Sequence, residues 1–385
     1  MSRLRGVLQT YVSDGSVPGA VGLVARGGQV EVAAAGAADA DGTRPMARDS
    51  IFRIASITKP IIAAAVMMLA EDGRIALDDP VRNWLPELAS PMVVRTPASP
   101  ADDVVPAARP ITVADLLTFR AGYGFPSDFS LPAVGLLFSE LKQGPPQPQA
   151  VAPPDQWMAT LSRIPLLYQP GEAWLYNTCS DILSVLIARV CGGPLPEFLA
   201  ERLFGPLGMA DTGFEVPAAK LGRFTGYYQA GPAGVLELID GPDGQWSSPP
   251  PFPSGSGGLV STADDWYRFA QMLLAGEGAG GGSGRQLLSA ASVRQMTTDY
   301  LTPAQRDASR LFLEGQGWGF GGSVDVEVID PWNVPGRYGW VGGTGTAAHV
   351  TPSTGTVTIL LTQVQTAGPT APALMRDFWQ YAAST

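Results

Sequence analysis

The sequence predicts an α+β fold in which helices flank an antiparallel sheet and a mainly helical domain is inserted into it. Strand-like segments occur at both ends of the chain, helical segments fill the middle, and 45% of the 385 residues are hydrophobic, enough for a large core. Because chain termini commonly lie close together, both sets of strands can share one sheet. We expect residues 1–85 and 300–385 to form the sheet domain and residues 86–299 the insertion, with the active site at the seam.

The N-terminal part predicts a helix followed by a hairpin. Residues 3–14 form an amphipathic segment. Residues 20–25 and 29–35 are strand-like, and Gly27-Gly28 between them is typical of a two-residue hairpin turn. The hairpin contributes two neighbouring antiparallel strands to the sheet.

The first half of the insertion is rich in loops. Residues 86–155 contain many prolines and glycines, and a long irregular region of this kind indicates a lid or a substrate-facing wall. Residues 111–117 predict a short helix with Thr112 as its N-cap. The aromatic residues of this region either pack the lid or contact a substrate: Tyr123, Phe125, Phe129 and Phe138.

The second half of the insertion predicts three helices, over residues 180–190, 196–203 and 263–275, with Thr262 as the N-cap of the last. Residues 276–284 are a glycine-rich linker.

The last hundred residues predict strands and a closing helix. Residues 323–329 alternate between apolar and charged positions, as in a half-buried strand. Residues 338–341, 347–351 and 356–363 predict three further strands, and residues 371–383 a helix.

Charge and histidine content exclude several functions. A net charge of −10 argues against nucleic acid as a partner. His349 is the only histidine, so a zinc site built on several histidines is excluded, and two cysteines cannot replace the missing ligands. A Ser-His-Asp triad would have to use His349, and the chain has no G-x-S-x-G nucleophile elbow. We expect no metal and no cofactor.

The cysteines and the apolar segments bear on location. Cys179 and Cys191 lie about three helical turns apart if this segment is helical, which is too far for a disulfide. Reduced cysteines are typical of the cytosol. The N-terminal residues lack an apolar core of signal-peptide length, and no run reaches the ~18 apolar residues of a membrane span. We therefore expect a cytoplasmic protein with no membrane partner; the sequence does not fix the oligomeric state.

Ser56 and Lys59 form the strongest chemical motif. They stand three residues apart at the start of the apolar run 61–71, which Asp72-Gly73 ends, so both side chains point into the same space. A helix this apolar is buried, and burial disfavours the ammonium form of lysine, which can then deprotonate the serine. The alternative is a lysine whose head reaches solvent. A second copy of the pattern, Ser139 with Lys142, lacks an apolar helix behind it and is interpreted as a solvated surface.

Two further segments suit this chemistry. Tyr176 precedes the predicted helix 180–190, where its hydroxyl can enter a cleft; near a lysine ammonium its phenolate form is favoured, so it can share proton transfer with Lys59. Its alternative role is an amphipathic side chain with its tip at solvent. Gly343 lies in a glycine-rich strand segment, and its N–H with that of Ser56 would make an oxyanion hole. The alternative is an ordinary glycine bend.

Together these segments resemble the serine β-lactamase-related superfamily, and within it the class C β-lactamase-like group that includes family VIII carboxylesterases and related acyltransferases. The resemblance runs through nearly the whole chain, over residues 18–22, 52–59, 111–118, 170–176, 204–209, 257–262 and 340–343.

The resemblance implies a β-lactamase/transpeptidase-like fold and an acyl-enzyme mechanism. Ser56 would be the acylated nucleophile, Lys59 and Tyr176 the base pair, and Gly343 part of the oxyanion hole. The substrate would be a small-molecule ester or acyl donor, and its expected contacts are Trp340, Tyr123, Gly342 and Thr344.

Two departures from the family pattern favour its esterase branch. Trp340 stands where β-lactamases and D,D-peptidases carry a cationic Lys or His, and Thr178 stands where they carry Asn, with Asn177 adjacent. Both changes disfavour β-lactam and peptidyl-D-Ala substrates. The sequence therefore predicts a carboxylesterase on small to medium esters. The alternatives are a biosynthetic acyltransferase, a weak β-lactamase, and a catalytically silent ligand-binding protein.

Overall fold

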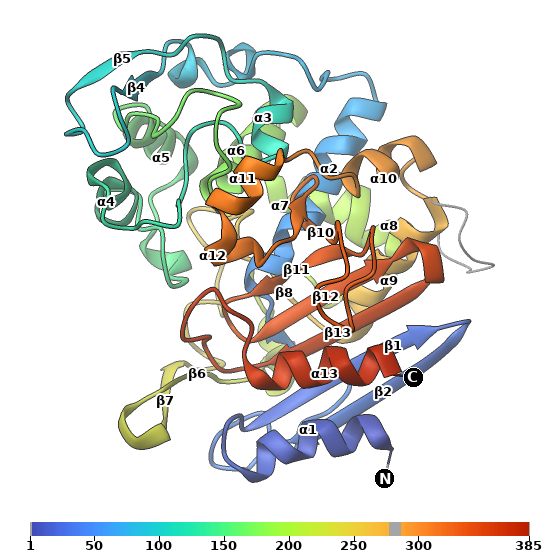
Figure 1. The fold of residues 1–385 in the computed structure, drawn as a ribbon. Coiled ribbons are helices and arrows are strands. Elements are labelled where there is room, and N and C mark those ends of the chain that lie inside the picture. The colour runs from blue at the N-terminus through green and yellow to red at the C-terminus, as the bar shows by residue number, and fades with distance from the viewer. Residues whose placement is uncertain (1, 277–285, 385) are drawn as a thin grey trace.

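The computed structural model describes residues 2–276 and 286–384, and a seven-stranded antiparallel sheet lies at its centre (Figure 1). The strand order is β2-β1-β13-β12-β11-β10-β9. The strands are β1 (Gly19–Arg26), β2 (Gln29–Gly36), β9 (Gly317–Trp318), β10 (Ser323–Val324), β11 (Tyr338–Gly342), β12 (Thr346–Thr351) and β13 (Thr356–Thr362). The N-terminal hairpin joins the C-terminal strands through β1 and β13, with Ala20 opposite Thr362. The prediction that both ends of the chain build one sheet is confirmed.

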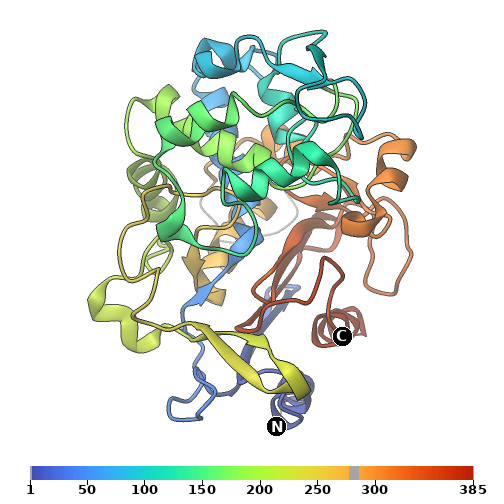
Figure 2. The same cartoon turned by 90° about the vertical axis from the view of Figure 1, so that its left-hand side faces the viewer.

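Helices cover both faces of this sheet. On one face α1 (Arg3–Ser13) and α13 (Ala373–Ser384) lie side by side, and their apolar residues pack on Ala20, Val24 and Leu360 (Figures 1 and 2). On the other face α9 (Ala263–Gly276) packs against β12 and β13. Side chains of successive strand residues point to opposite faces, which is why one strand serves both layers.

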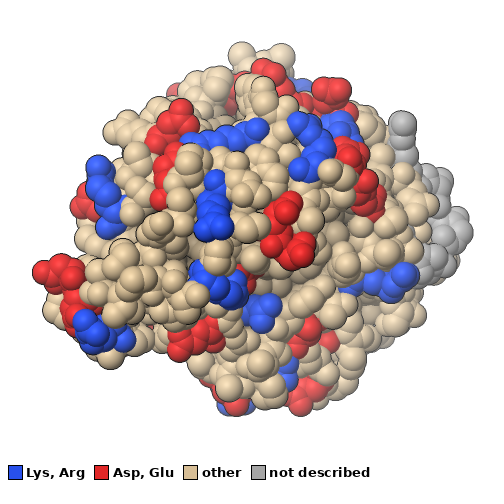
Figure 3. Space-filling model, turned by 90° about the horizontal axis from the view of Figure 1, so that it is seen from above, with Lys and Arg blue, Asp and Glu red and all other residues tan. Residues whose placement is uncertain are grey.

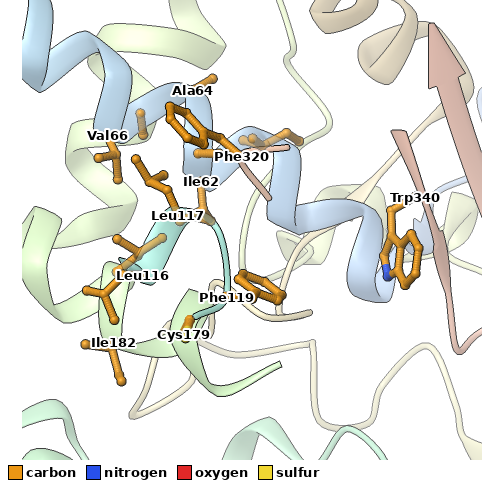
Figure 4. Close-up of a cluster of buried hydrophobic side chains, with 14 of the residues drawn as sticks. Ile62, Ala64, Val66, Leu116, Leu117, Phe119, Cys179, Ile182, Phe320 and Trp340 are labelled. Carbon is orange, nitrogen blue, oxygen red and sulfur yellow. The ribbon is translucent and has the colours of Figure 1, made fainter. Parts of the chain in front are cut away.

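The remaining helices form the mainly helical part, with α2 (Lys59–Glu71) passing through the middle of the molecule (Figure 1). Every residue from Lys59 to Leu69 is buried. Figure 4 shows Ile62, Ala64 and Val66 of this helix near Leu116 and Leu117 of α3 and Ile182 of α6. The other helices are α3 (Val113–Leu117), α4 (Pro132–Ser139), α5 (Pro154–Leu161), α6 (Thr178–Cys191), α7 (Leu195–Leu199), α8 (Gly205–Leu207), α10 (Ala290–Met296), α11 (Pro303–Ala308) and α12 (Arg310–Leu313).

Three short hairpins or strand pairs complete the structure: β3 (Phe52–Arg53) with β8 (Val260–Ser261), β4 (Met92–Val94) with β5 (Val104–Pro106), and β6 (Tyr227–Ala230) with β7 (Leu236–Asp240). The β6–β7 hairpin projects from the body of the molecule (Figure 1).

The predicted strand 323–329 is wrong beyond its first two residues. The chain leaves the sheet after Val324, and Val328 and Ile329 are exposed. The buried carboxylate of Asp325 is the cause, since it accepts hydrogen bonds from Gln316 Nε2 and from the backbone N–H of Val334, and so organises a loop instead of a strand.

Other sequence predictions need smaller corrections. The predicted insertion, residues 86–299, includes helix α9, which packs on the sheet. The region 86–155 contains α4 and the start of α5, both of which begin with proline in their first turn. Of the glycine-rich linker 276–284, all but Gly276 lies outside the described residues.

The surface carries charges of both signs. On the face in Figure 3 the acidic and basic side chains are interspersed over a mostly uncharged surface. Within the described ranges no single helix is long and apolar enough to cross a membrane; α6 and the segment Leu195–Leu207 meet the test only as a pair bent by 80°.

A buried ion pair holds the segment that precedes Ser56. Arg53 of β3 contacts Asp240 at the end of β7, and the two side chains are 2% and 6% exposed. Arg53 also donates to the carbonyls of Thr225 at 2.7 Å and Gly241 at 2.8 Å, and its guanidinium lies 4.0 Å from the ring centroid of Phe224. The charge is therefore paired, and each of the three guanidinium nitrogens donates at least one hydrogen bond.

Removing the Arg53 side chain should leave the buried Asp240 carboxylate without a counter-charge. We predict that Arg53→Ala lowers the free energy of unfolding by about 3–5 kcal/mol. The control is Arg48→Ala, whose ion pair with Asp264 involves a side chain that is 59% exposed; it should cost about 1 kcal/mol or less. Urea unfolding of the two variants measures the difference, and equal losses would contradict a structural role for the Arg53 pair.

Candidate active site

A strained turn presents Ser56. The residue lies in a 3₁₀ turn, Ala55–Thr58, that leads directly into α2. Ala55 has a φ of 46°, in the left-handed region that non-glycine residues rarely adopt. Strand β12 and the turn before it fix the preceding backbone, because Thr344 Oγ1 donates to the carbonyl of Arg53 at 2.6 Å and Thr346 Oγ1 to that of Ile54 at 2.9 Å.

The amine of Lys59 lies 2.8 Å from Ser56 Oγ. Its Nζ also donates to the backbone carbonyl of Ser256, and the residue is 0% exposed. Burial lowers the pKa of Lys59 to about 7, against the opposing charge of Asp181. A large fraction of the amine is therefore neutral near pH 7 and can accept the proton of the Ser56 hydroxyl.

Tyr176 completes a three-residue cluster. Backbone hydrogen bonds of 2.9 Å in both directions pair it with Phe125 just before α6, and Asn177 after it has a φ of 83°. Its hydroxyl is hydrogen-bonded to Ser56 and accepts from Trp340 Nε1 at 2.8 Å, and its ring centroid lies 4.7 Å from Lys59 Nζ. The structure thus brings together the three predicted catalytic residues.

Burial opposes the phenolate form expected for Tyr176. Burial raises the pKa of Tyr176 to about 12, and the hydrogen bonds from Ser56 and Trp340 oppose this only in part. Near neutral pH the side chain is a phenol, so it can donate a proton to a leaving group and is not an initial base.

Strand β11 forms the edge of the site. A Cβ on Gly342 would lie 2.7 Å from the carbonyl oxygen of Ile54 and 3.3 Å from Ala55 Cβ, so the strand passes directly against the Ser56 turn. Gly343 follows the strand and lines the same cavity as Ser56. This is the place that an oxyanion-hole donor needs, and the assignment of Gly343 to that role stays a prediction.

A cavity of about 310 Å³ opens above Ser56. Its walls are mainly apolar, with aromatic members Phe125, Trp157, Tyr176, Tyr227, Trp246, Phe252, Phe312 and Trp340. Among the described lining residues only Lys142 is basic, and its side chain is exposed and donates to the carbonyl of Ser139 at 2.9 Å. The cavity suits an uncharged, largely apolar substrate.

Two predicted substrate contacts lie elsewhere. Tyr123 is 2% exposed and lines a separate small cavity, and Thr344 is 1% exposed and bonded to the Arg53 carbonyl. The other two, Trp340 and Gly342, do line the main cavity. His349 is buried in β12, its ring 5.5 Å from that of Trp379, and does not line the cavity. Cys179 and Cys191 are both free.

Sequence reasoning missed five of the aromatic wall residues: Trp157, Tyr227, Trp246, Phe252 and Phe312. Trp157 and Phe252 pack against each other with centroids 5.1 Å apart, and Phe312 lies 4.8 Å from the ring of Tyr176. The five come from α5, β6, loops and α12, which are distant in sequence and carry no local pattern that marks them.

The family model described as "Beta-lactamase" matches residues 4–378. The chain belongs to the beta-lactamase family. Protein Rv1367c of Mycobacterium tuberculosis is 39% identical to this chain over 359 residues. The match covers 91% of this chain and 86% of that protein.

Two relatives have named activities. Esterase EstB of Burkholderia gladioli is 29% identical over 394 residues, covering 96% of this chain and 92% of its own. The solved structure of EstCE1, described as a hydrolase with promiscuous acyltransferase activity, has a TM-score of 0.79 and 25% identity and covers 100% of this chain and 98% of that one. The β-lactamase/transpeptidase-like fold of this family member is thereby established.

The lowered pKa of Lys59 predicts a specific pH dependence. The amine must be unprotonated to accept the Ser56 proton, so kcat/KM should fall as pH drops below about 7 and level off above it. A pH–rate profile with a neutral chromogenic ester checks this. A profile without an acidic limb between pH 5 and 9 would contradict the role of Lys59 as a neutral base.

Tyr176→Phe should lower kcat by about 10²-fold or more, because it removes a positioned proton donor. Tyr123→Phe is a matched control, since Tyr123 is also a buried tyrosine but lies outside the main cavity. Steady-state kinetics should show a wild-type kcat for the control. Similar values of kcat for both variants would contradict the role of Tyr176 as a proton donor.

Proposed function

We propose that this protein is a serine carboxylesterase that acts on small to medium neutral esters through an acyl-enzyme on Ser56. The observation that carries the proposal is the cluster of Ser56, Lys59 and Tyr176 at an apolar cavity edged by Trp340. The esterase names of relatives such as EstB support it.

The residues divide the reaction into two halves. Neutral Lys59 takes the proton of the Ser56 hydroxyl as Oγ attacks the ester carbonyl carbon, and the backbone N–H groups of Ser56 and Gly343 receive the oxyanion. The tetrahedral intermediate collapses as the alcohol leaves with a proton from the Tyr176 hydroxyl, which Lys59 re-protonates. Water then attacks the acyl carbonyl carbon and gives a proton to neutral Lys59. Lys59 returns a proton to Ser56 Oγ as the bond between Oγ and the acyl carbon breaks, which releases the carboxylic acid and free Ser56.

Trp340 favours esters over charged acyl donors. Its indole N–H is committed to the Tyr176 hydroxyl at 2.8 Å, and its side chain is 3% exposed. It offers no positive charge for a substrate carboxylate. A β-lactam or a peptidyl carboxylate would enter without a counter-charge, and the loss of its hydration would be uncompensated. We therefore expect slow turnover of β-lactams.

Acyl transfer to an alcohol is a second candidate activity. The rings of Phe312 and Trp340 line the cavity with centroids 4.8 and 5.7 Å from that of Tyr176, and they give it an apolar wall where an acceptor alcohol can compete with water. Product analysis of an ester in the presence of added methanol measures the partition between acid and methyl ester.

Covalent capture of Ser56 tests the proposal. Incubation with p-nitrophenyl acetate or butyrate should give a burst and turnover, and rapid quench should add one acyl mass to the peptide containing Ser56. Ser56→Ala should abolish both, whereas Ser139→Ala, in the exposed second copy of the motif, should behave as wild type. Absence of a burst, of turnover and of the acyl mass would favour a silent ligand-binding protein; nitrocefin turnover faster than ester turnover would favour a β-lactamase.

A further inference from the structure

A buried carboxylate beside the catalytic cluster has no part in the mechanism above. Asp181 lies in the first turn of α6 and is 4% exposed. Its Oδ1 accepts hydrogen bonds from the Ser254 hydroxyl at 2.7 Å and from the backbone N–H of Ser256 at 3.0 Å, and its Oδ2 accepts from Gln143 Nε2 at 3.1 Å. All three groups donate to the carboxylate, as its ionised form requires.

The backbone of Ser256 connects this carboxylate to the catalytic amine. Asp181 holds the N–H of Ser256, and the carbonyl of the same residue accepts from Lys59 Nζ. The hydroxyls of Ser254 and Ser256 also lie 2.9 Å apart, so several hydrogen bonds fix this segment. A shift of the segment would move the group that orients Lys59 toward Ser56, and a misplacement of about 1 Å can cost about 10²-fold in rate.

The charge of Asp181 also acts on Lys59. Burial lowers the pKa of Lys59, and the neighbouring carboxylate opposes that change. Burial likewise raises the pKa of Asp181, while its hydrogen bonds and Lys59 oppose the rise. A buried acid and a buried amine thus each favour the charged form of the other.

The other titratable groups around this pair are uncharged or exposed. Tyr176, whose ring centroid lies 4.7 Å from Lys59 Nζ, is a phenol at neutral pH. Burial raises the pKa of the Cys179 thiol on α6 to about 12. Lys142 lines the same cavity, but its side chain is exposed. The negative charge that bears on Lys59 is therefore that of Asp181.

We propose that Asp181 is a positioning residue for the acylation of Ser56: it anchors segment 254–256, which orients the Lys59 amine toward the Ser56 hydroxyl. This inference rests on the proposed serine mechanism. A second hydrogen-bond path holds the Asp181 carboxylate, because Gln143, which donates to its Oδ2, also accepts from Thr178 Oγ1 at 2.6 Å.

The anchoring by Asp181 and the effect of its charge can be separated by two substitutions. Asp181→Asn keeps an oxygen that accepts from Ser254 and Ser256 but removes the charge. Without that charge Lys59 loses its proton at lower pH, so the midpoint of the pH profile should move to lower pH by about one unit or more. Asp181→Ala also removes the anchor, so the rate above the midpoint should fall by about 10²-fold.

The readout is the rate of covalent labelling of Ser56 by a fluorophosphonate probe as a function of pH, which needs no knowledge of the natural substrate. The matched control is Asp265→Asn. Asp265 is 2% exposed and accepts from the N–H of Asp211 at 2.7 Å and Thr212 Oγ1 at 3.0 Å, but lies on α9 outside the cavity lining. Its labelling profile should match wild type.

The outcomes distinguish the two proposals. If wild type is labelled at Ser56, and either Asp181→Ala keeps the wild-type rate or Asp181→Asn leaves the profile unchanged, the role of Asp181 is wrong and the serine mechanism stands. If wild type is not labelled, both fall. If Asp181→Ala does not fold, as circular dichroism would show, the Asn variant still decides, since only a charge effect on Lys59 moves the midpoint to lower pH.

Discussion

The contact between the Lys59 amine and the Ser56 hydroxyl, 2.8 Å apart and removed from water, is the interaction on which the site depends. A lysine in water is an ammonium near pH 7 and has no lone pair to accept a proton. Burial of α2 removes the hydration that stabilises the ammonium and lowers the pKa of Lys59 to about 7. Burial of this apolar helix therefore both builds the core and lowers the pKa of the lysine that acts as the base.

Several distant parts of the chain maintain this contact. The Arg53–Asp240 ion pair fixes the approach to Ser56, α6 carries Asp181 and begins just after Tyr176, and β11 closes the other side with Trp340 and Gly342. Non-glycine residues with positive φ directly precede Ser56 and follow Tyr176, at Ala55 and Asn177. Strain of this kind persists only where the surrounding structure over-determines it, and here the hydrogen bonds from Thr344 and Thr346 and the backbone pairing of Tyr176 with Phe125 do so.

Local patterns allowed much of the fold to be predicted. The Gly27-Gly28 hairpin, the apolar helix after Ser56 and the Thr112 cap, whose hydroxyl accepts from the N–H of Asp115, all depend on neighbours in sequence. The strand predicted for 323–329 failed because a tertiary hydrogen-bond network around Asp325 outweighs an alternating pattern.

The site shows the same division. Ser56, Lys59 and Tyr176 stand in recognisable motifs and meet in space, whereas Trp157, Phe252 and Phe312 carry no pattern and reach the cavity only through folding. The burial that raises the pKa of Tyr176 could not be predicted, because a sequence shows which charge is nearby but not how far a hydroxyl is buried. Asp181 illustrates this too, since only its contacts with segment 254–256 relate it to Lys59.

Direct titration of Lys59 tests the central claim. The chain has only three lysines, Lys59, Lys142 and Lys220, so ¹³Cε-lysine labelling gives few NMR signals, and the one lost in Lys59→Arg is assigned at once. The chemical shift of that signal should titrate with a midpoint near 7, following the lowered pKa of Lys59 to about 7. A midpoint near the ordinary lysine value of about 10.4 would show that the amine is a permanent cation and contradict its role as the base.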